Sequence, residues 1–258
     1  PATLNPATGR PYALDFPLLT IKDIVSVQRE LVRSLGIRKL RAVSGPSLGG
    51  LQAFAWARYF PEMVESIIPV ISLPMIRPMM LMNPGQLAID AIQLDPNWKH
   101  GNYFGGPPPN QGLLLAFKIL LMAAKSDQGL EAAYGRDIAD SRHSPYEFFD
   151  GQFKVDKTTE DLLSGRLHTL DANAYIYLSK AVTLFDLRKP GQSLEEALGE
   201  MHTRTLLIND ASDLMFGPRQ SEMAVQMLGN AGLYLYDSGN GHLSGLYQTE
   251  LFAHKVAE

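Results

Sequence analysis

The segment that most constrains the fold of this chain is residues 44–50, with the sequence Ser-Gly-Pro-Ser-Leu-Gly-Gly. It follows an apolar, β-rich stretch at residues 39–43 and precedes a helical pattern at residues 51–59. The glycines two residues before and after Ser47 let a strand and a helix approach closely at a sharp turn. Such a turn strains the serine backbone and exposes its hydroxyl at the edge of a parallel sheet. We therefore predict an α/β fold in which Ser47 is a candidate nucleophile.

Two later segments place a carboxylate and a histidine directly after predicted strands. Residues 203–209 predict a buried strand, and Asp213 follows it in a polar turn. Residues 231–237 predict the next strand, and His242 follows it in a glycine-rich loop. Ligands bind at the carboxyl ends of strands in open α/β sheets. The chain order Ser47, Asp213, His242 is that of the nucleophile, acid and base of α/β-hydrolases.

The acid and the base each have an alternative assignment. Asp210 directly follows the strand and is a second candidate for the acid, while Asp213 is also a candidate N-cap for a helix after Pro218. We favour Asp213 over Asp210. Of the six histidines, His242 follows the acid in a tight glycine-flanked loop, whereas His254 lies in a predicted terminal helix.

These residue types suit nucleophilic acyl chemistry. A serine hydroxyl is a poor nucleophile until a base removes its proton, which is the role expected of His242. Asp213 is expected to hold the imidazole tautomer and to stabilise the imidazolium. The backbone N–H of Leu48, the residue after the nucleophile, is the expected donor to an oxyanion hole.

Composition narrows the class of protein. The 258 residues suffice for one large α/β domain with an insertion. The net charge of −4 gives no basic footprint, so we expect no nucleic-acid partner. No apolar run approaches the roughly 18 residues of a membrane span, and the lack of cysteine excludes disulfides and a thiol nucleophile. We expect a cytoplasmic protein with a small-molecule substrate, no metal and no bound cofactor.

The spacing of the predicted strands divides the chain into a core and an insertion. The gap between a strand at residues 64–71 and the strand at 203–209 is about 130 residues, far longer than an ordinary crossover. Its patterns are mostly helical, at residues 85–94, 112–124, 129–134, 171–185 and 194–201. We predict an α/β-hydrolase fold, a mostly parallel sheet flanked by helices, with a core at residues 1–72 and 191–258 and a helical lid at 73–190.

The segment before Ser47 is short for this fold. Its 46 residues predict one strand and one helix, which Thr20 caps and which covers residues 21–35. In an α/β-hydrolase several strands precede the nucleophile, and an early loop supplies a second oxyanion donor. We therefore expect that N-terminal strands of about 70–130 residues are absent from this chain. If cleavage produced it, a companion chain is expected to complete the sheet.

Short motifs occur along nearly the whole chain. They read NPATGRPY at residues 5–12, GPSLGGLQ at 45–52, DPNW at 95–98, GNY at 101–103, GL at 112–113, DANAY at 171–175, FDL at 185–187, SDLMF at 212–216 and GH at 241–242. Together they resemble the homoserine O-acetyltransferase-like branch of the α/β-hydrolases. The resemblance implies a ping-pong reaction in which Ser47 takes an acetyl group from acetyl-CoA, or from another acyl-CoA, and passes it to a hydroxyl acceptor. It also implies a homodimer formed through the lid helices.

The chain departs from that family's pattern where the acceptor binds. An arginine of the family that holds a carboxylate aligns with Phe117, and a second arginine aligns with Ile89. A tyrosine of the family aligns with Ala124, and the acidic residue after the histidine aligns with Leu243. All four changes remove polar or charged partners for a small amino acid. We therefore expect Phe117, Ala124 and Leu243 to line a more apolar substrate pocket that is not specific for homoserine.

Three functions stay open from the sequence. The first is transfer of an acyl group from an acyl-CoA to a less polar alcohol. The second is ester hydrolysis, in which water replaces the acceptor at the same acyl-enzyme. The third is a non-catalytic homologue or fragment that mediates assembly, and the intact Ser47, Asp213 and His242 argue against it.

Overall fold

The computed structural model describes residues 1–257, which group into two compact units. The core unit comprises residues 19–78, 124–126 and 181 onward, and the helical unit comprises residues 1–18, 79–123 and 127–180. These boundaries lie within about ten residues of the expected lid boundaries. The first 18 residues, which we had assigned to the core, group with the helices instead.

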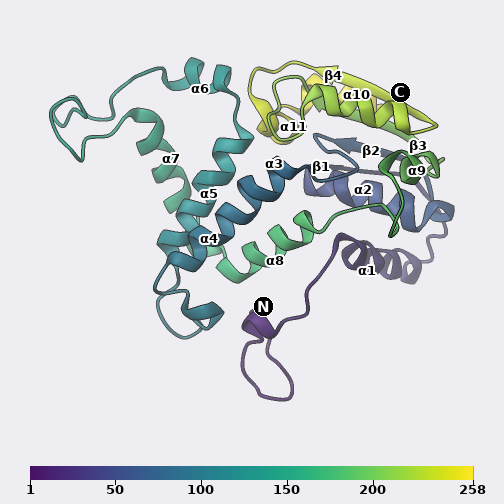
Figure 1. Ribbon diagram of the computed structural model, residues 1–258, viewed down its shortest axis with the longest axis horizontal. Helices are drawn as coiled ribbons and strands as arrows, with labels where there is room; N and C mark the ends of the chain where they lie inside the picture. Colours follow the sequence, from purple (N-terminus) through teal and green to yellow (C-terminus); the bar gives the residue numbers. More distant parts are fainter. Residues whose placement is uncertain (258) are drawn as a thin grey trace. The chain divides into compact units, whose positions relative to one another are not determined.

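The core unit is built on four strands, labelled in Figure 1 as β1 (Leu40–Pro46), β2 (Val64–Val70), β3 (Arg204–Asp210) and β4 (Ala231–Tyr236). Within the described residues they form one sheet in the order β1-β2-β3-β4, and every pairing is parallel. Because parallel strands point the same way, all four carboxyl ends lie at one edge of the sheet. The predicted parallel α/β architecture is confirmed.

Helices connect and cover these strands. Helix α2 (Leu48–Tyr59) connects β1 to β2 and packs on both, and α10 (Pro218–Met227) does the same for β3 and β4. The other helices wholly inside the core unit are α1 (Ile21–Ser34), α9 (Leu194–Gly199), α11 (Ser244–Tyr247) and α12 (Ala253–Ala257). In Figure 1, α1 lies beside α2, in agreement with their packing contacts. The short α3 (Pro78–Met80) spans the boundary of the two units.

Strand side chains alternate between two apolar layers. On one face of the sheet, Val70, Ile208 and Tyr236 form a buried cluster with Phe252. Successive strand residues point to opposite faces, so the fully buried Leu207 belongs to the other layer. Burial of one such side chain stabilises the fold by about 1.5–3 kcal/mol. The buried apolar layers therefore fix the positions of the strands and of the polar residues at their carboxyl ends.

The first helix of the core unit begins and ends as its sequence predicts. The Thr20 side chain accepts from the Asp23 N–H, and the Asp23 carboxylate accepts from the Thr20 N–H at 2.8 Å, which completes a capping box. After α1, Gly36 adopts a positive φ of 77°. The Gly36 and Ile37 N–H groups donate to carbonyls of the last helical turn, as in a Schellman motif.

The helical unit consists of α4 (Leu87–Leu94), α5 (Asn110–Ala124), α6 (Asp127–Tyr134), α7 (Lys154–Ser164) and α8 (Ala172–Thr183), of which α5 and α8 end within the core unit. Four of these correspond to predicted helices. Helix α7 was not predicted, because its sequence is polar on average and has apolar residues only at Val155, Leu162 and Leu163. Ion pairs support it instead: the Lys118 ammonium contacts Asp156 and Glu160, and Lys157 contacts Asp161 one turn later.

The N-terminal residues belong to the helical unit through Tyr177. The Tyr177 hydroxyl donates to the backbone carbonyls of Leu14 and Phe16, at 3.0 and 2.6 Å. The Phe16 ring meets the Tyr177 ring edge-on. Leu14 also fills the space above Gly101, where an added Cβ would lie 2.7 Å from the leucine side chain. These contacts explain why residues 1–18 depart from the expected division.

Several of the family-like motifs meet in a buried polar network of the helical unit. The Trp98 indole N–H donates to the Asn173 side chain at 3.0 Å, and the Asn173 amide donates to the Gly101 carbonyl at 2.9 Å. The Tyr103 hydroxyl donates to the Asp171 carboxylate at 2.5 Å and accepts from the Asn173 N–H. Burial, aided by the hydrogen bond to Asp171, raises the pKa of Tyr103. These motif residues have a structural role, because each satisfies a partner that the fold has buried.

Candidate active site

Ser47 occupies a single-residue turn between β1 and α2. Its φ of 50° and ψ of −113° are unusual for a residue with a side chain, and such a conformation costs about 1–3 kcal/mol. The Ser47 N–H donates to the Val70 carbonyl at 2.9 Å, which ties the turn to the end of β2. The predicted strained serine turn at the carboxyl edge of the sheet is present.

Two glycines allow this turn, because neighbouring atoms pack so closely against them that no Cβ would fit. A Cβ on Gly45 would lie 2.9 Å from the backbone of Gly49, and a Cβ on Gly50 would lie 2.4 Å from the Cβ of Ser72. A Cβ on Gly49 would make only an ordinary contact, at 3.5 Å from Pro46. The sequence pattern predicts the close approach at Gly45 and Gly49. The structure corrects the second position to Gly50.

Ser47, His242 and Asp213 form one chain of hydrogen bonds. The Nε2 atom of His242 lies 2.7 Å from the Ser47 Oγ, and its Nδ1 atom lies 2.8 Å from the Asp213 Oδ2. Both His242 and Asp213 are buried. With Nδ1–H donating to the carboxylate, Nε2 is left to accept the serine proton. The three residues selected from chain order are thus within hydrogen-bonding distance.

The loop after β3 fixes the Asp213 carboxylate. Its Oδ1 atom accepts from the backbone N–H groups of Met215 and Phe216, at 2.8 and 3.2 Å, which leaves Oδ2 for the histidine. Gly217, not Asp213, is the N-cap residue of α10. The second candidate, Asp210, is fully buried and bonded to serines rather than to His242. Of the two aspartates, Asp213 is therefore the one that contacts the His242 imidazole.

The loop that carries His242 is packed against the end of α5. Gly241 has a φ of 71°, and a Cβ there would lie 2.8 Å from the Ser126 N and 3.0 Å from the Ala124 carbonyl oxygen. The Ser126 hydroxyl donates to the Gly239 carbonyl. Ala124 therefore lies beside the residue that precedes His242, and the half-buried Leu243 follows it directly. Two of the three predicted pocket residues flank the histidine loop.

The third predicted pocket residue belongs to the helical unit. Phe117 lies on α5, and its ring meets that of Tyr175 edge-on with centroids 5.0 Å apart. Both rings pack on the apolar cluster that contains Ile89 and Ala116. Within this unit Phe117 and Ile89 therefore act as core side chains.

Leu48 is the first residue of α2. The first N–H groups of a helix have no intrahelical acceptor and carry partial positive charge. The Leu48 N–H is one of these groups, so Leu48 remains the expected oxyanion donor.

Asn209 supports the site and was missed in the sequence. Its Oδ1 atom accepts from the Ser72 N–H at 3.1 Å, and its Nδ2 atom donates to the Phe216 carbonyl at 3.2 Å and to the Ser221 hydroxyl at 2.5 Å. It joins the segment after β2 to the loop after β3. The signal available in the sequence was a pair of polar residues, Asn209 and Asp210, directly after the apolar residues 206–208.

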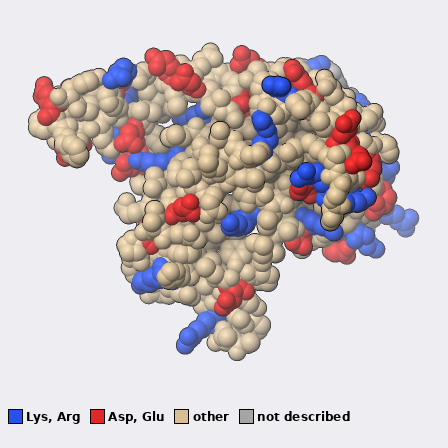
Figure 2. Space-filling view, in the orientation of Figure 1, with Lys and Arg blue, Asp and Glu red and all other residues tan. Residues whose placement is uncertain are grey.

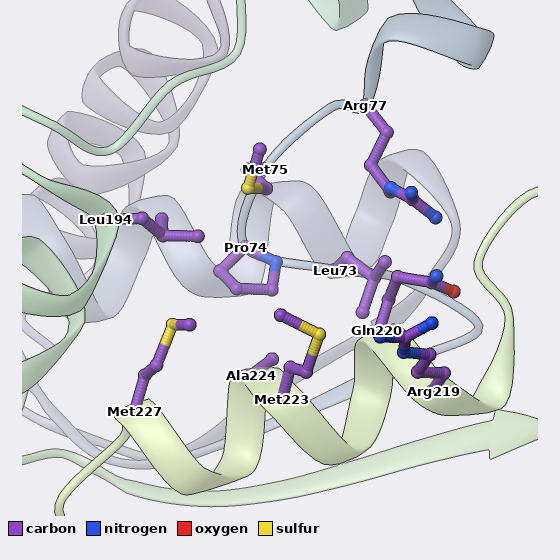
Figure 3. A pocket seen from close by; sticks show the side chains of 10 residues that line it. All are labelled: Leu73, Pro74, Met75, Arg77, Leu194, Arg219, Gln220, Met223, Ala224 and Met227. Atoms are coloured by element: carbon purple, nitrogen blue, oxygen red, sulfur yellow. The ribbon is translucent and has the colours of Figure 1, made fainter.

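A separate pocket of about 370 Å³ lies within the core unit, between the segment that follows β2, the start of α9 and one face of α10 (Figure 3). Met75, Met223 and Met227 contribute much of its apolar lining, and Arg77 and Arg219 stand at one end. Ser47, Asp213 and His242 are not among the described residues that line it. The pocket therefore carries no part of the hydrogen-bonded chain.

Residues 1–257 show neither a metal-binding cluster nor a membrane-spanning helix. There, no group of three or more His, Cys, Asp or Glu side chains is arranged to hold a metal ion. No described helix is long and apolar enough to cross a membrane. Figure 2 shows acidic and basic side chains interspersed on one face of the molecule. The candidate active site is therefore the hydrogen-bonded group of Ser47, His242 and Asp213.

The chain is similar in sequence and in structure to known α/β hydrolases. The α/β hydrolase fold family matches residues 7–248. The homoserine O-acetyltransferase of Moorella thermoacetica is 36% identical over 246 residues, which cover 94% of this chain and 65% of that protein. The chain thus spans less than two thirds of the length of this relative.

Two solved structures are similar over almost the whole chain. A homoserine O-acetyltransferase from Bacillus anthracis is 38% identical with a TM-score of 0.93, and 99% of this chain matches 69% of that one. An esterase, E22, is 31% identical with a TM-score of 0.89, and 99% of this chain matches 70% of it. Acetyltransferases and esterases therefore share this arrangement of strands and helices.

Proposed function

The chain belongs to the homoserine O-acetyltransferase-like family of α/β-hydrolases, and from this premise we propose that it transfers acyl groups through an acyl-enzyme at Ser47. The observation that carries the proposal is the 2.7 Å contact between the His242 Nε2 and the Ser47 Oγ, with Asp213 on the other imidazole nitrogen. A base within hydrogen-bonding reach of a serine hydroxyl is the arrangement that nucleophilic catalysis requires. The preferred donor is an acyl-CoA thioester.

In the first half-reaction the Ser47 oxygen attacks the carbonyl carbon of the thioester. The serine proton passes to His242 Nε2, and the new imidazolium is stabilised by the Asp213 carboxylate. When the carbon–sulfur bond breaks, His242 returns that proton to the departing thiolate. The products are the free thiol and an ester of Ser47.

In the second half-reaction an alcohol replaces the thiol. Its hydroxyl oxygen attacks the Ser47 ester while its proton passes to His242, and the proton then returns to the Ser47 oxygen as that ester breaks. The Leu48 N–H, at the start of α2, donates to the oxyanion in both steps. Loss of one such donor typically slows acyl transfer by about 10²–10³-fold.

The acceptor we propose is an alcohol less polar than homoserine. Ala124 and Leu243 flank the loop that carries His242, and neither side chain can pair with an ammonium or a carboxylate. A site that binds a charged amino acid needs such partners, since a buried unpaired charge is strongly disfavoured. Phe117 supports the same proposal, because it stands where the family has an arginine that holds a carboxylate.

Ester hydrolysis is the second candidate function. It uses the same acyl-enzyme, with water as the acceptor, and the structural likeness to the esterase E22 at 31% identity favours it. The two activities differ in how well the closed site excludes water from the Ser47 ester. Both require Ser47, His242 and Asp213 in the same roles.

The ratio of acetylated alcohol to free acetate among the products distinguishes acyl transfer from hydrolysis. The protein is incubated with acetyl-CoA or p-nitrophenyl acetate and with homoserine, with 1-hexanol or with no acceptor, and the acetylated products are quantified by mass spectrometry. We expect 1-hexyl acetate in excess of free acetate. Free acetate alone, at a rate that no alcohol changes, assigns hydrolysis. Efficient formation of O-acetylhomoserine overturns the proposed apolar acceptor.

A further inference from the structure

Asp210 is a buried carboxylate surrounded by serines. It ends β3 and has no exposed surface. Its Oδ1 atom accepts from the N–H and the hydroxyl of Ser212, at 2.8 and 2.7 Å, and from the Ser238 N–H at 3.4 Å. Its Oδ2 atom accepts from the Ser244 hydroxyl at 2.5 Å and from the Ser238 hydroxyl. Two carboxylate oxygens thus bind three serines.

These serines come from the loop that carries the acid, the loop that carries the base and the first residue of α11. Ser212 immediately precedes Asp213, while Ser238 and Ser244 lie four residues before and two residues after His242. The loop after β3 and the loop after β4 therefore meet at one side chain.

Further hydrogen bonds extend the cluster towards the histidine. The Ser212 hydroxyl accepts from the Gly241 N–H at 3.0 Å, and the Ser244 hydroxyl lies 2.8 Å from the Gly241 carbonyl oxygen. The Tyr236 hydroxyl lies 2.9 Å from the Ser244 hydroxyl. Burial raises the pKa of Tyr236 to about 12, so this hydroxyl stays neutral. The N–H of the residue before His242 is therefore held by Ser212, which in turn donates to Asp210.

We propose that Asp210 is a positioning residue that sets the distance between Asp213 and His242 by binding both of their loops. It touches neither imidazole nor substrate and acts only through Ser212, Ser238 and Ser244. This inference rests on the proposed function, because the geometry it sets is that of the acyl-transfer site. A displacement of about 1 Å at such a site can slow catalysis by about 10²-fold.

The charge on Asp210 is what the cluster requires. Each serine hydroxyl donates to it, and only an ionised carboxylate accepts at both oxygens without donating. The serine N–H and hydroxyl groups that donate to it stabilise this charge. Burial alone would raise its pKa, but the hydrogen bonds from Ser238, Ser244 and Ser212 more than offset this and lower the pKa of Asp210.

The test compares Asp210→Asn with Asp237→Asn. The first variant keeps the shape of the side chain but turns one acceptor into an NH₂ donor facing serine hydroxyls. The second makes the same change on Asp237, an exposed aspartate directly after β4, where asparagine can still accept from the Gly239 N–H. We measure the acylation burst with p-nitrophenyl acetate, the KM, the melting temperature and the low-field proton resonance of the His242 Nδ1–H.

For folded Asp210→Asn we expect an acylation rate reduced by about 10- to 100-fold, an unchanged KM and a shifted or broadened His242 resonance. Asp237→Asn should match the wild type in all four measurements. A folded Asp210→Asn protein with a wild-type burst and an unchanged resonance overturns the proposal. If Asp210→Asn does not fold, Ser244→Ala, which removes one donor and keeps the charge, decides the matter by the same criteria.

Failure of the proposed function gives a different result. A wild-type protein that neither releases p-nitrophenol nor gains an acetyl group refutes acyl transfer, whatever Asp210 does. The His242 resonance still reports whether Asp210 sets the contact with Asp213 in that case. An unchanged resonance in Asp210→Asn then rejects the positioning role, and a changed one supports it.

Discussion

The Nε2 atom of His242 lies 2.7 Å from the Oγ atom of Ser47, although 195 positions separate the two residues in the chain. The parallel sheet brings them together, because Ser47 follows β1 and His242 follows β4 at the same edge. Asp213, after β3, completes the chain of hydrogen bonds. The order of strands thus assembles three side chains from distant segments into one proposed site.

The role of Asp213 predicts a severe effect of a nearly isosteric change. Asp213→Asn keeps the size of the side chain but presents an amide to the histidine, which favours the wrong imidazole tautomer. We expect kcat for p-nitrophenyl acetate to fall by about 10⁴-fold, with circular dichroism showing a folded protein. A folded variant that loses less than about tenfold would contradict the assigned role.

The close packing behind Ser47 predicts opposite effects at adjacent glycines. Gly50→Ala would place a Cβ 2.4 Å from the Ser72 Cβ, so we expect overpacking to lower the free energy of unfolding by about 1–3 kcal/mol. Gly49→Ala meets only an ordinary contact and restricts the unfolded chain, so it should be neutral or stabilising by up to about 1 kcal/mol. Urea unfolding of both variants measures the difference. Equal effects at the two positions would be inconsistent with the packing described.

The capping box of α1 predicts a loss of stability at an exposed site. Thr20→Ala removes the acceptor for the Asp23 N–H and should lower the free energy of unfolding by about 1 kcal/mol. Ser26→Ala, one turn into the same helix, should change stability by no more than a few tenths of a kcal/mol, since alanine favours helix. Chemical denaturation compares the two. A Thr20→Ala protein as stable as Ser26→Ala would show that the box contributes nothing.

The lowered pKa of Asp210 predicts a pH-dependent contribution to stability. A carboxyl whose folded-state pKa lies below its unfolded value of 3.8 stabilises the fold above that value, and the contribution is lost as the pH falls through the folded pKa. The difference in unfolding free energy between wild type and Asp210→Asn should therefore be constant near neutral pH and shrink below about pH 4. Urea unfolding between about pH 7 and about pH 3 measures it. A difference that grows on acidification has the wrong sign for this account.

Much of the core was predictable because local signals and topology agree. The strained turn at Ser47 needs a strand before it and a helix after it, and both patterns are plain in the sequence. Chain order then selected Asp213 and His242. The helix bounds of α1 followed from Thr20 and Gly36, whose capping roles are local.

What the sequence did not predict depends on contacts made by the folded chain. The need for glycine at position 50 comes from Ser72, which lies on the segment after the neighbouring strand. Asp210 was considered only as an alternative acid, since its serine partners lie on two separate loops. Helix α7 is polar on average and is supported by ion pairs to Lys118. Residues 1–18 group with the helices through Tyr177, which is more than 150 positions away in the chain.

The measurement that tests the central claim most directly is the intact mass of the protein after brief exposure to acetyl-CoA or p-nitrophenyl acetate, followed by peptide mapping. We predict that the wild type gains one acetyl group on Ser47, that the Asp213→Asn protein gains it far more slowly, and that the Ser47→Ala protein gains none. An unmodified wild-type protein that turns over neither reagent, or an adduct that persists in Ser47→Ala, would contradict an acyl-enzyme at Ser47.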